Sequence, residues 1–294
     1  PVMRIAIFGK QFDPAFDEYC LALFRHLSLT GAGICIYKPF YEFVSGIPGI
    51  KLNPDSVFKD HADLPECDML FSIGGDGTFL DAVTIVRDRP IPIVGINSGR
   101  LGFLADVSKD ELPSALNDIF EGHYKVRQLY LLKLDTHIPA FGELDFALNE
   151  FAVAKRDSSS MITIHANLNG DYLNSYWADG LIIATATGST AYSLSVGGPI
   201  MHPASKNLII NPIAPHNLTV RPLVVPNDFD LTLRVESRGG SYLVSLDSRS
   251  CILEESIELK IRKADFSVSV IERNGKTFYS TLRSKLMWGA DRRN

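Results

Sequence analysis

The sequence predicts two domains: an α/β N-terminal domain with a mostly parallel sheet flanked by helices, and a β-rich, sandwich-like C-terminal domain. A length of 294 residues is enough for two ordinary domains. Strand and helix patterns alternate over about the first 120 residues, and a two-residue period dominates after Gly122. We expect one domain over 1–122 plus about 275–294, and the other over 123–274.

The N-terminal half alternates short apolar runs with helical patterns. Met3–Phe8 predicts a buried strand, and Pro14–Leu27 carries apolar residues at the spacing of an amphipathic helix. Strands are then expected at 33–37, 69–73 and 92–96, and helices at 79–86 and from Ser108, where Ser108 and Glu111 have capping-box spacing.

The C-terminal half carries alternating apolar and polar residues over 162–168, 231–236 and 257–261. Such alternation predicts half-buried strands. Asn274-Gly275 is a turn signal, and Phe278, Leu282 and Leu286 predict a last helix. Because a single helix after a β domain needs a packing partner, we expect it to return to the first domain.

Composition restricts the function classes. The formal charge is −5, no basic run is present, and a nucleic-acid binder usually shows a basic face. No apolar run approaches the roughly 20 residues that span a bilayer. The four cysteines are scattered without a Cys-x-x-Cys pair, and no secretory leader is evident, so we expect a reduced, cytoplasmic protein. No histidine pair has zinc spacing.

The sharpest motif is Gly74-Gly75-Asp76-Gly77-Thr78, between a predicted strand and a predicted helix. Its glycines allow positive φ and close backbone approach, and the following helix N-terminus favours a phosphate. The string matches neither Gly-x-Gly-x-x-Gly nor the Walker pattern. A tight turn with Asp76 as an N-cap is the structural alternative. We favour a phosphate cradle with one carboxylate inside it.

Two further polar strings lie in the second half. Asn149-Glu150 alone is typical of a solvated loop. The stretch from Asp179 to Pro199 places an apolar strand, 181–184, before a hydroxyl-rich turn, Thr187–Ser195. Such hydroxyls can bind phosphate, ribose or amide groups, although Ser and Thr also form ordinary turns.

Together these strings resemble the NAD kinase family, in its bacterial type. The similarity covers Gly74–Thr78, Asn97–Leu104, Asn149-Glu150, Asp179–Pro199 and Lys285–Gly289, in order. Diacylglycerol, sphingosine and phosphofructokinase-type kinases share the glycine-aspartate string, whereas the Asp179–Pro199 stretch is far more specific. The resemblance implies an ATP-dependent kinase for the adenosine-ribose 2′-hydroxyl of NAD, with its site between the two domains and a divalent ion, Mg²⁺, bound with ATP. It also implies a homo-oligomer, dimer or tetramer.

The resemblance also implies roles for individual residues. Asp76 would be the general base, and Gly74, Gly75, Gly77 and Thr78 would hold the donor phosphates. Asn149 and Glu150 would hold the adenosine and its ribose, and Asp179 the nicotinamide end. The remaining residues expected at the NAD site are Gly77, Asp81, Phe103, Trp177, Thr187, Thr190, Ala191, Tyr192, Ser193, Leu194, Ser195, Ala214 and Arg249.

Three positions depart from the family pattern. Asp81 replaces a basic or other polar residue, Trp177 replaces an Arg of some relatives, and Asp247-Ser248-Arg249 replaces Asp-Gly-Gln or Asp-Ser-Gln. Two other functions stay open: a lipid or sugar kinase that shares the glycine turn, and a non-catalytic dinucleotide sensor. ATP versus polyphosphate as donor, NAD versus NADH as acceptor, and feedback by NADP(H) also stay open.

Overall fold

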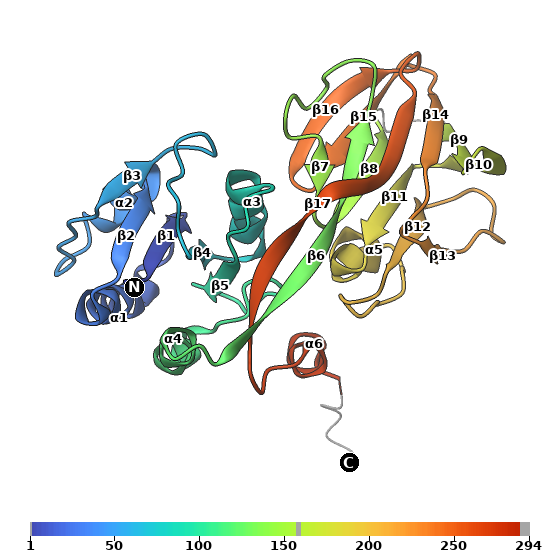
Figure 1. Ribbon diagram of the computed structural model, residues 1–294. Coiled ribbons are helices and arrows are strands. Elements are labelled where there is room, and N and C mark those ends of the chain that lie inside the picture. Colours follow the sequence, from blue (N-terminus) through green and yellow to red (C-terminus); the bar gives the residue numbers. More distant parts are fainter. Residues whose placement is uncertain (1, 157–159, 289–294) are drawn as a thin grey trace. The chain divides into compact units, whose positions relative to one another are not determined.

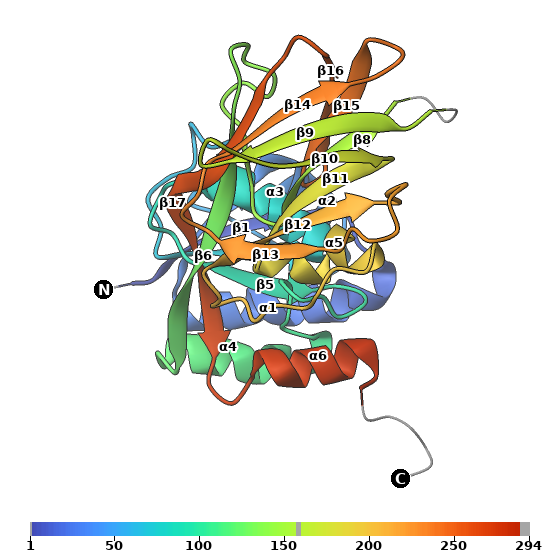
Figure 2. The same cartoon turned by 90° about the vertical axis from the view of Figure 1, so that its right-hand side faces the viewer.

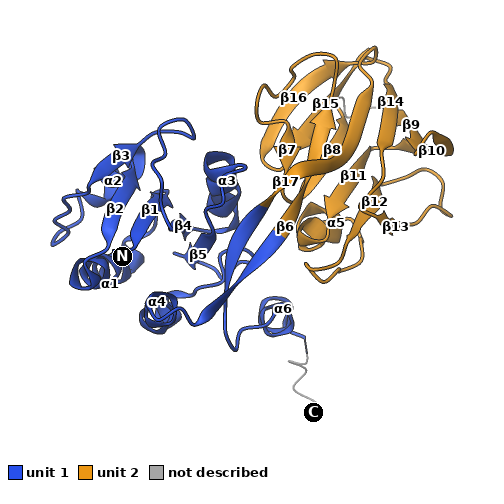
Figure 3. Cartoon of the chain, in the orientation of Figure 1, with its two compact units in different colours: residues 1–128, 268–294 blue, residues 129–267 orange. Residues whose placement is uncertain are grey.

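A computed structural model describes residues 2–156 and 160–288 of the chain (Figure 1). It separates into two compact units, coloured in Figure 3. Unit 1 comprises Pro1–Gln128 and Val268–Asn294, and unit 2 comprises Leu129–Ser267. Strands β6 (Tyr124–Asp135) and β17 (Leu259–Arg273) each contain one of the boundaries. In the described part of the chain, no helix combines the length and apolar character that a bilayer crossing needs.

Unit 1 alternates strands with helices, as the sequence predicts. Its elements are β1 (Arg4–Gly9), α1 (Asp17–Thr30), β2 (Gly33–Tyr37), α2 (Lys38–Val44), β3 (Ser56–Phe58), β4 (Met69–Gly74), α3 (Asp76–Val86), β5 (Ile93–Asn97), α4 (Leu112–Phe120) and α6 (Phe278–Leu286). Short 3-10 turns, Pro14–Phe16 and Lys109–Glu111, precede α1 and α4. The predicted capping box of Ser108 and Glu111 is present.

The strands of unit 1 form a parallel sheet in the order β3-β2-β1-β4-β5. From β1 the chain moves outward to β2 and β3, and then returns to the other side of β1 with β4. The order therefore reverses at β1 and β4. Open α/β sheets bind ligands at the carboxyl ends of their strands, at such a reversal.

Helices cover both sides of this sheet. A buried apolar cluster joins Ile5 and Ile7 of β1 with Leu23 of α1 and Leu116 of α4. Helix α3 lies on the opposite side of β4 and β5 from α1 and α4 (Figures 1 and 2). Every residue of β4 is buried, which explains why the sequence of this strand is apolar apart from Ser72.

The C-terminal helix α6 belongs to unit 1, which confirms the predicted return. Two cations just before α6 pair with Glu111: Arg273 at 3.2 Å and Lys276 at 2.9 Å. Thr277 then caps α6 through a reciprocal bond with Ser280. The helix is thereby fixed next to the start of α4.

Unit 2 is a layered β structure. Its elements are β7 (Phe146–Ala147), β8 (Glu150–Lys155), β9 (Ile162–Leu168), β10 (Asp171–Ala178), β11 (Gly180–Thr185), α5 (Tyr192–Ser195), β12 (Asn207–Ile213), β13 (Leu223–Pro226), β14 (Leu231–Glu236), β15 (Ser241–Leu246) and β16 (Arg249–Glu254), with most of β6 and β17. A 3-10 turn, Thr187–Thr190, follows β11.

Two antiparallel sheets share the core of unit 2. One has the order β13-β12-β11-β8-β15-β16, and the other contains β10-β9-β14-β17. One buried cluster contains Ile164 and Leu233 from one sheet together with Leu181 and Tyr242 from the other. The sandwich-like prediction is therefore confirmed.

Several elements differ from their predicted limits, among them α1, α3 and β17. Helix α3 begins at Asp76 rather than Phe79, with Gly75 as its N-cap residue. An acidic residue in the first turn suits the positive end of the helix dipole, so the helix can start inside the glycine string. Strand β17 runs on to Arg273 instead of ending near Ile261. Helix α2 was not predicted, because its pattern covers only seven residues.

Candidate active site

The glycine string forms a tight turn between β4 and α3. Gly74 has a φ of 156°, and a Cβ at this position would overlap the side chain of Thr78. A Cβ on Gly75 or Gly77 would meet nothing within 4 Å, so the backbone there faces open space. The turn therefore has the close-approach surface that a phosphate needs, at the N-terminus of an eleven-residue helix.

Asp76 is bound by three consecutive backbone N–H groups. Phe103 donates to Oδ2 at 2.8 Å, and Leu104 and Ala105 each donate to Oδ1 at 2.9 Å. Asp76 is in the first turn of α3, and its side chain does not cap the helix, so the N-cap alternative is wrong. Hydrogen bonds to a carboxylate are strong, and three of them hold this one in a single orientation.

The segment that binds Asp76 is itself held against the glycine turn. Asn97 donates through Nδ2 to the carbonyl of Arg100 at 2.6 Å and accepts from the Gly99 N–H at 2.7 Å. Ser98 donates its N–H to the carbonyl of Gly74 at 3.2 Å. The Asn97–Leu104 string is therefore a loop that folds onto the turn.

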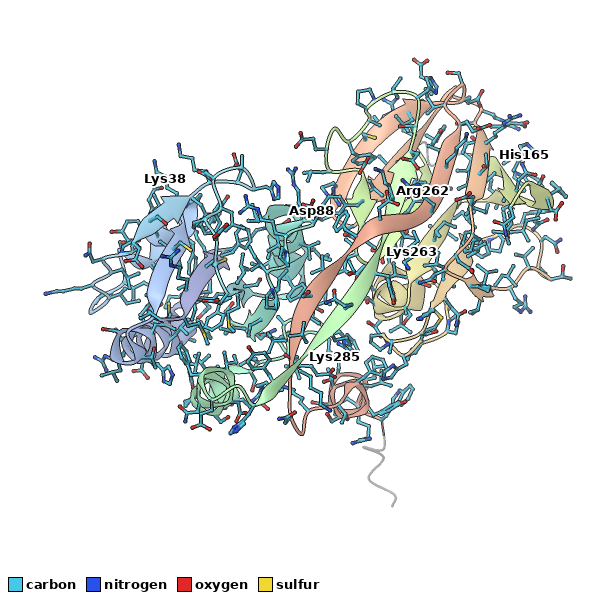
Figure 4. The ribbon with its side chains drawn as sticks, in the orientation of Figure 1. Lys38, Asp88, His165, Arg262, Lys263 and Lys285 are labelled. Atoms are coloured by element: carbon cyan, nitrogen blue, oxygen red, sulfur yellow. The ribbon has the colours of Figure 1, made fainter. Side chains whose placement is uncertain are left out.

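Helix α6 contacts the same loop. Lys285, labelled in Figure 4, donates to the carbonyl of Leu101, and its Nζ lies 5.5 Å from the centre of the Phe103 ring. The rings of Phe103 and Phe278 lie 6.5 Å apart. The returning helix thus fixes the outer side of the loop whose inner side binds Asp76.

In unit 2, Asp247 makes an arrangement of the same kind. Its carboxylate accepts the N–H groups of Leu148 and Asn149 at 2.8 Å and of Glu150 at 3.1 Å. Asp247 has a φ of 52°, an unusual value for a residue other than glycine. Burial raises the pKa of Asp247, whereas the three N–H groups and Arg249 lower it.

Glu150 is a buried carboxyl group with an unused acceptor. Its Oε2 has no hydrogen-bond partner among the described residues. Burial, followed by the nearby charge of Asp247, raises the pKa of Glu150 to about 7, although the Tyr192 N–H lowers it. Buried polar atoms are almost always paired, so this oxygen is a candidate for contact with a ligand or a water molecule.

The hydroxyl-rich turn divides into an inner and an outer set. Thr185 donates to the carbonyl of Leu148 at 2.6 Å and accepts from the Gly188 N–H. Ser189 and Ser193 are fully buried, and Asn211 donates to Ser193 Oγ at 3.1 Å. Tyr192 is exposed. The residues that are partly or fully accessible are Thr187, Thr190, Ala191, Tyr192, Leu194 and Ser195.

A second polar group lies at the opposite end of β11. Asp179 precedes this strand and pairs with Lys155 at 2.7 Å. The ring of Trp177, which is half exposed, lies 4.2 Å from that of His216 and is tilted by 45° to it. Ala214, with a φ of 44°, follows Ile213, whose carbonyl accepts the Asp179 N–H. Unit 2 therefore carries candidate residues at both ends of one strand.

Two predicted residues have partners that the sequence did not indicate. Asp81 forms an ion pair with Lys10, at the end of β1. Arg249 donates to the carbonyls of Leu144 and Phe146, and its guanidinium lies 5.3 Å from the centre of the Phe146 ring.

The sequence did not indicate the contacts of Lys10, Gly102 and Asp247. Lys10 lies two residues after the predicted strand Met3–Phe8, where ligand-binding residues of α/β sheets occur, and that position was an available signal. Gly102 and Asp247 lie in strings that the sequence singled out, but their partners are far away in the sequence, so no local pattern indicated these contacts.

Divalent ions in phosphoryl-transfer sites usually take one or two carboxylates and otherwise substrate phosphates. In the described ranges, no three His, Cys, Asp or Glu side chains group together in a way that could hold a metal ion. Asp76 is the carboxylate at the glycine turn, and its Oδ2 accepts only one hydrogen bond from the described residues. The turn thus fits an ion held mainly by donor phosphates.

A glycine turn at the carboxyl end of a parallel strand, with one fixed carboxylate inside it, is typical of a phosphotransferase site. Comparison with known proteins places the chain in this class of enzyme. The models of the ATP-NAD kinase N-terminal and C-terminal domains match residues 44–124 and 148–273. The chain therefore belongs to the NAD kinase family.

Individual relatives cover nearly all of the chain. The chain is 47% identical to an NAD kinase of Bacteroides fragilis and 44% identical to one of Cytophaga hutchinsonii. Both alignments cover 99% of this chain and 100% of the relative. Among solved structures, yeast NADH kinase complexed with NADH has a TM-score of 0.87 at 21% identity, covering 99% of this chain and 89% of that one. An NAD kinase from Archaeoglobus fulgidus in complex with ATP has a TM-score of 0.75 at 25% identity, covering 97% and 99%.

Proposed function

We propose that this protein transfers the γ-phosphate of ATP to the adenosine-ribose 2′-hydroxyl of NAD and so produces NADP. The observation that carries the proposal is the Asp76 carboxylate, fixed by three N–H groups beside an open glycine turn. The bacterial relatives at 44–47% identity are NAD kinases, and the archaeal relative was solved with ATP.

Asp76 is the proposed general base. A carboxylate oxygen can accept two hydrogen bonds, and Oδ2 accepts only that of Phe103. Oδ2 therefore has a lone pair available for the ribose hydroxyl. A carboxylate is a weak base for an alcohol, so the proton moves late, as the ribose oxygen attacks in line with the leaving phosphate. General-base catalysis of this kind contributes about 10²–10⁴-fold.

The donor phosphates are assigned to Gly74, Gly75, Gly77 and Thr78. The open backbone at Gly75 and Gly77 and the N-terminus of α3 support this assignment. Phosphoryl transfer depends mostly on positioning and charge neutralisation. Mg²⁺, held mainly by the donor phosphates, would supply part of that neutralisation when bound.

The dinucleotide is assigned to unit 2, with adenosine at Asn149 and Glu150 and the nicotinamide end at Asp179. These groups flank opposite ends of β8 and β11, where Glu150 pairs with Ala184 and Ala154 with Gly180. A six-residue strand spans about 20 Å, which suits an extended two-nucleotide ligand. At one end, Glu150 has a carboxylate oxygen, Oε2, without a hydrogen-bond partner among the described residues.

The remaining residues of the proposed site come from both units. Phe103 and Asp81 contribute from unit 1, and Trp177, Ala214, Arg249 and the accessible part of Thr187–Ser195 contribute from unit 2. Unit 1 would be the donor-phosphate domain and unit 2 the dinucleotide domain. We also expect a homo-oligomer, dimer or tetramer, which light scattering after gel filtration would identify.

A coupled assay tests the proposal. The protein is incubated with NAD, ATP and Mg²⁺, and NADP is detected with a dehydrogenase that strictly requires NADP. NADP formation is the expected result. Phosphorylation of a diacylglycerol, sphingosine or sugar acceptor without NADP would favour another kinase, and NAD binding without ATP consumption would favour a sensor. Parallel reactions with polyphosphate and with NADH identify the donor and the acceptor.

A further inference from the structure

A cavity of about 630 Å³ lies in unit 1 at the carboxyl ends of the parallel strands. Its walls come from the Phe8–Gln11 segment after β1, from Tyr37, Pro39 and Phe40, and from Asp81 and Thr84 of α3. Ligand pockets typically measure about 300–1,000 Å³. The cavity adjoins β1 and lies beside the strand that leads into the glycine turn, at the reversal of strand order where α/β sheets bind ligands.

Three aromatic residues, Phe8, Tyr37 and Phe40, contribute to the walls of this cavity. The rings of Phe8 and Tyr37 are 4.6 Å apart, and Phe40 lies so close to Gly9 that a Cβ there would come within 2.6 Å of its ring. Gly9 thus lets the aromatic wall approach the strand end. Flat apolar walls of this kind suit a nucleoside base.

The cavity also holds one ion pair, between Lys10 and Asp81. The side chain of Lys10 is 59% exposed, and that of Asp81 is 31% exposed. Gly9 is in register with Ile73, and the Lys10 N–H bonds the Ile73 carbonyl at 3.4 Å. Because Ile73 directly precedes Gly74, Lys10 lies one strand away from the glycine turn. An ammonium there is placed to reach phosphates on that turn.

We infer that this cavity binds the nucleoside of the triphosphate donor and that Lys10 binds its phosphates. The inference rests on the proposed function, and it assigns the donor residues outside the glycine turn. Asp81 holds Lys10 while the cavity lacks a donor, and it competes with the donor for the ammonium. Asp81, which stands where relatives have a basic or other polar residue, is therefore assigned to the donor site.

The inference predicts that substitutions of Lys10 and of Asp81 change the affinity for the donor in opposite directions. Isothermal titration measures binding of the non-hydrolysable ATP analogue AMP-PNP, with Mg²⁺, to the full chain. Lys10→Met is expected to weaken binding at least about tenfold, because it removes a hydrogen bond between charged groups. Asp81→Asn is expected to tighten binding, because it removes a competing and repelling carboxylate. Thr84→Phe, which fills the cavity, is expected to weaken it.

Lys51→Met is the matched control, since Lys51 is exposed in unit 1 and does not line the cavity. The melting temperature of each variant verifies folding. Equal weakening by Lys10→Met and Asp81→Asn would show a merely structural ion pair and overturn the inference. Unchanged affinity in Lys10→Met and Thr84→Phe would also overturn it.

Photolabelling locates the nucleoside independently of these variants. With 8-azido-ATP, the label is expected on peptides that contain 8–11, 37–40 or 81–85, with AMP-PNP protecting and NAD not protecting. A label confined to unit 2 contradicts the inference. If the parent forms no NADP but the labelling and titration patterns hold, the proposed function fails and the donor site stands. If NADP forms from ATP without those patterns, the donor site fails alone.

Discussion

The carboxylate of Asp76 fills the space that a side chain at Gly102 would occupy. The next three residues, Phe103, Leu104 and Ala105, donate their N–H groups to the same carboxylate. Gly102 is thus required so that the loop can close around Asp76. Orientation of the proposed base depends on a residue without a functional group.

Gly102→Ala is therefore expected to reduce turnover while keeping the Asp76 carboxylate. The added methyl group forces the loop away from Asp76, and overpacking of this kind costs about 1–3 kcal/mol of unfolding free energy. We expect kcat to fall at least about tenfold, in line with loss of roughly one strong hydrogen bond. Gly99→Ala is the control, because a Cβ on Gly99 meets nothing within 4 Å. Equal kcat values for the two variants would contradict the role of Gly102.

Lys285→Met is expected to lower kcat without unfolding the protein. It removes the bond to the Leu101 carbonyl and the contact with the Phe103 ring, both on the outer side of the loop. We expect a loss of about threefold to thirtyfold, corresponding to one hydrogen bond from a charged group. Arg283→Met provides a matched change on the same helix at an exposed position. If both variants lower kcat equally, charge on α6 matters and the specific contact does not.

Asp247→Asn is expected to weaken NAD binding and to lower stability. The Asp247 side chain is only 5% exposed, and an amide presents one donor where the carboxylate presents an acceptor. At least one of the N–H groups of 148–150 would then be unpaired, at a cost of about 1–3 kcal/mol. Titration of NAD and thermal melting measure the two effects. The control Asp171→Asn changes an exposed aspartate of the same unit. If Asp247→Asn binds NAD with the affinity of the parent, Asp247 does not support the NAD site.

Glu150 is expected to make stability fall as pH rises from about 4.5 to about 7. Its pKa is raised from 4.5 to about 7 by burial first and then by the charge of Asp247. Between these values the folded protein holds a proton that the unfolded chain has lost, so the folded state is favoured at the lower pH. The full effect is at most about 3 kcal/mol.

Glu150→Gln keeps the shape of the side chain but cannot titrate, so it should remove this part of the pH dependence. Melting temperatures from pH 4.5 to 8 measure it, with the parent losing more than the variant. Parallel curves for the two proteins would show that Glu150 does not titrate in this range.

The sequence predicted those parts of the fold that depend on local patterns. The apolar run of β4, the capping box of Ser108 and Glu111, and the spacing of Phe278 and Leu282 each indicated their element correctly. The β-rich second half followed from alternating residues such as those of 231–236. The start of α3 was missed because the helix begins inside the glycine string, where propensity argues against it.

The sequence indicated which residues belong to the candidate site, but it did not indicate which residues contact them. Asp76 stood out in its turn, yet its three donors are 27 to 29 residues away. Asp247 meets its donors across 97 to 99 residues. Such contacts arise from packing of the strands, and a single sequence carries no local signal for them. The identity of the acceptor as NAD likewise came from resemblance, because hydroxyl-rich turns bind many ligands.

The most direct test of the account is the effect of Asp76→Asn on turnover and on NAD affinity, measured side by side. NAD affinity, from titration calorimetry, should fall far less than turnover, because Asn keeps the side-chain shape and one acceptor oxygen while leaving at least one of the three N–H groups unpaired. NADP formation should fall by at least about 10²-fold, since Asn cannot accept the ribose proton. Turnover equal to that of the parent would contradict the assignment of Asp76 as the base.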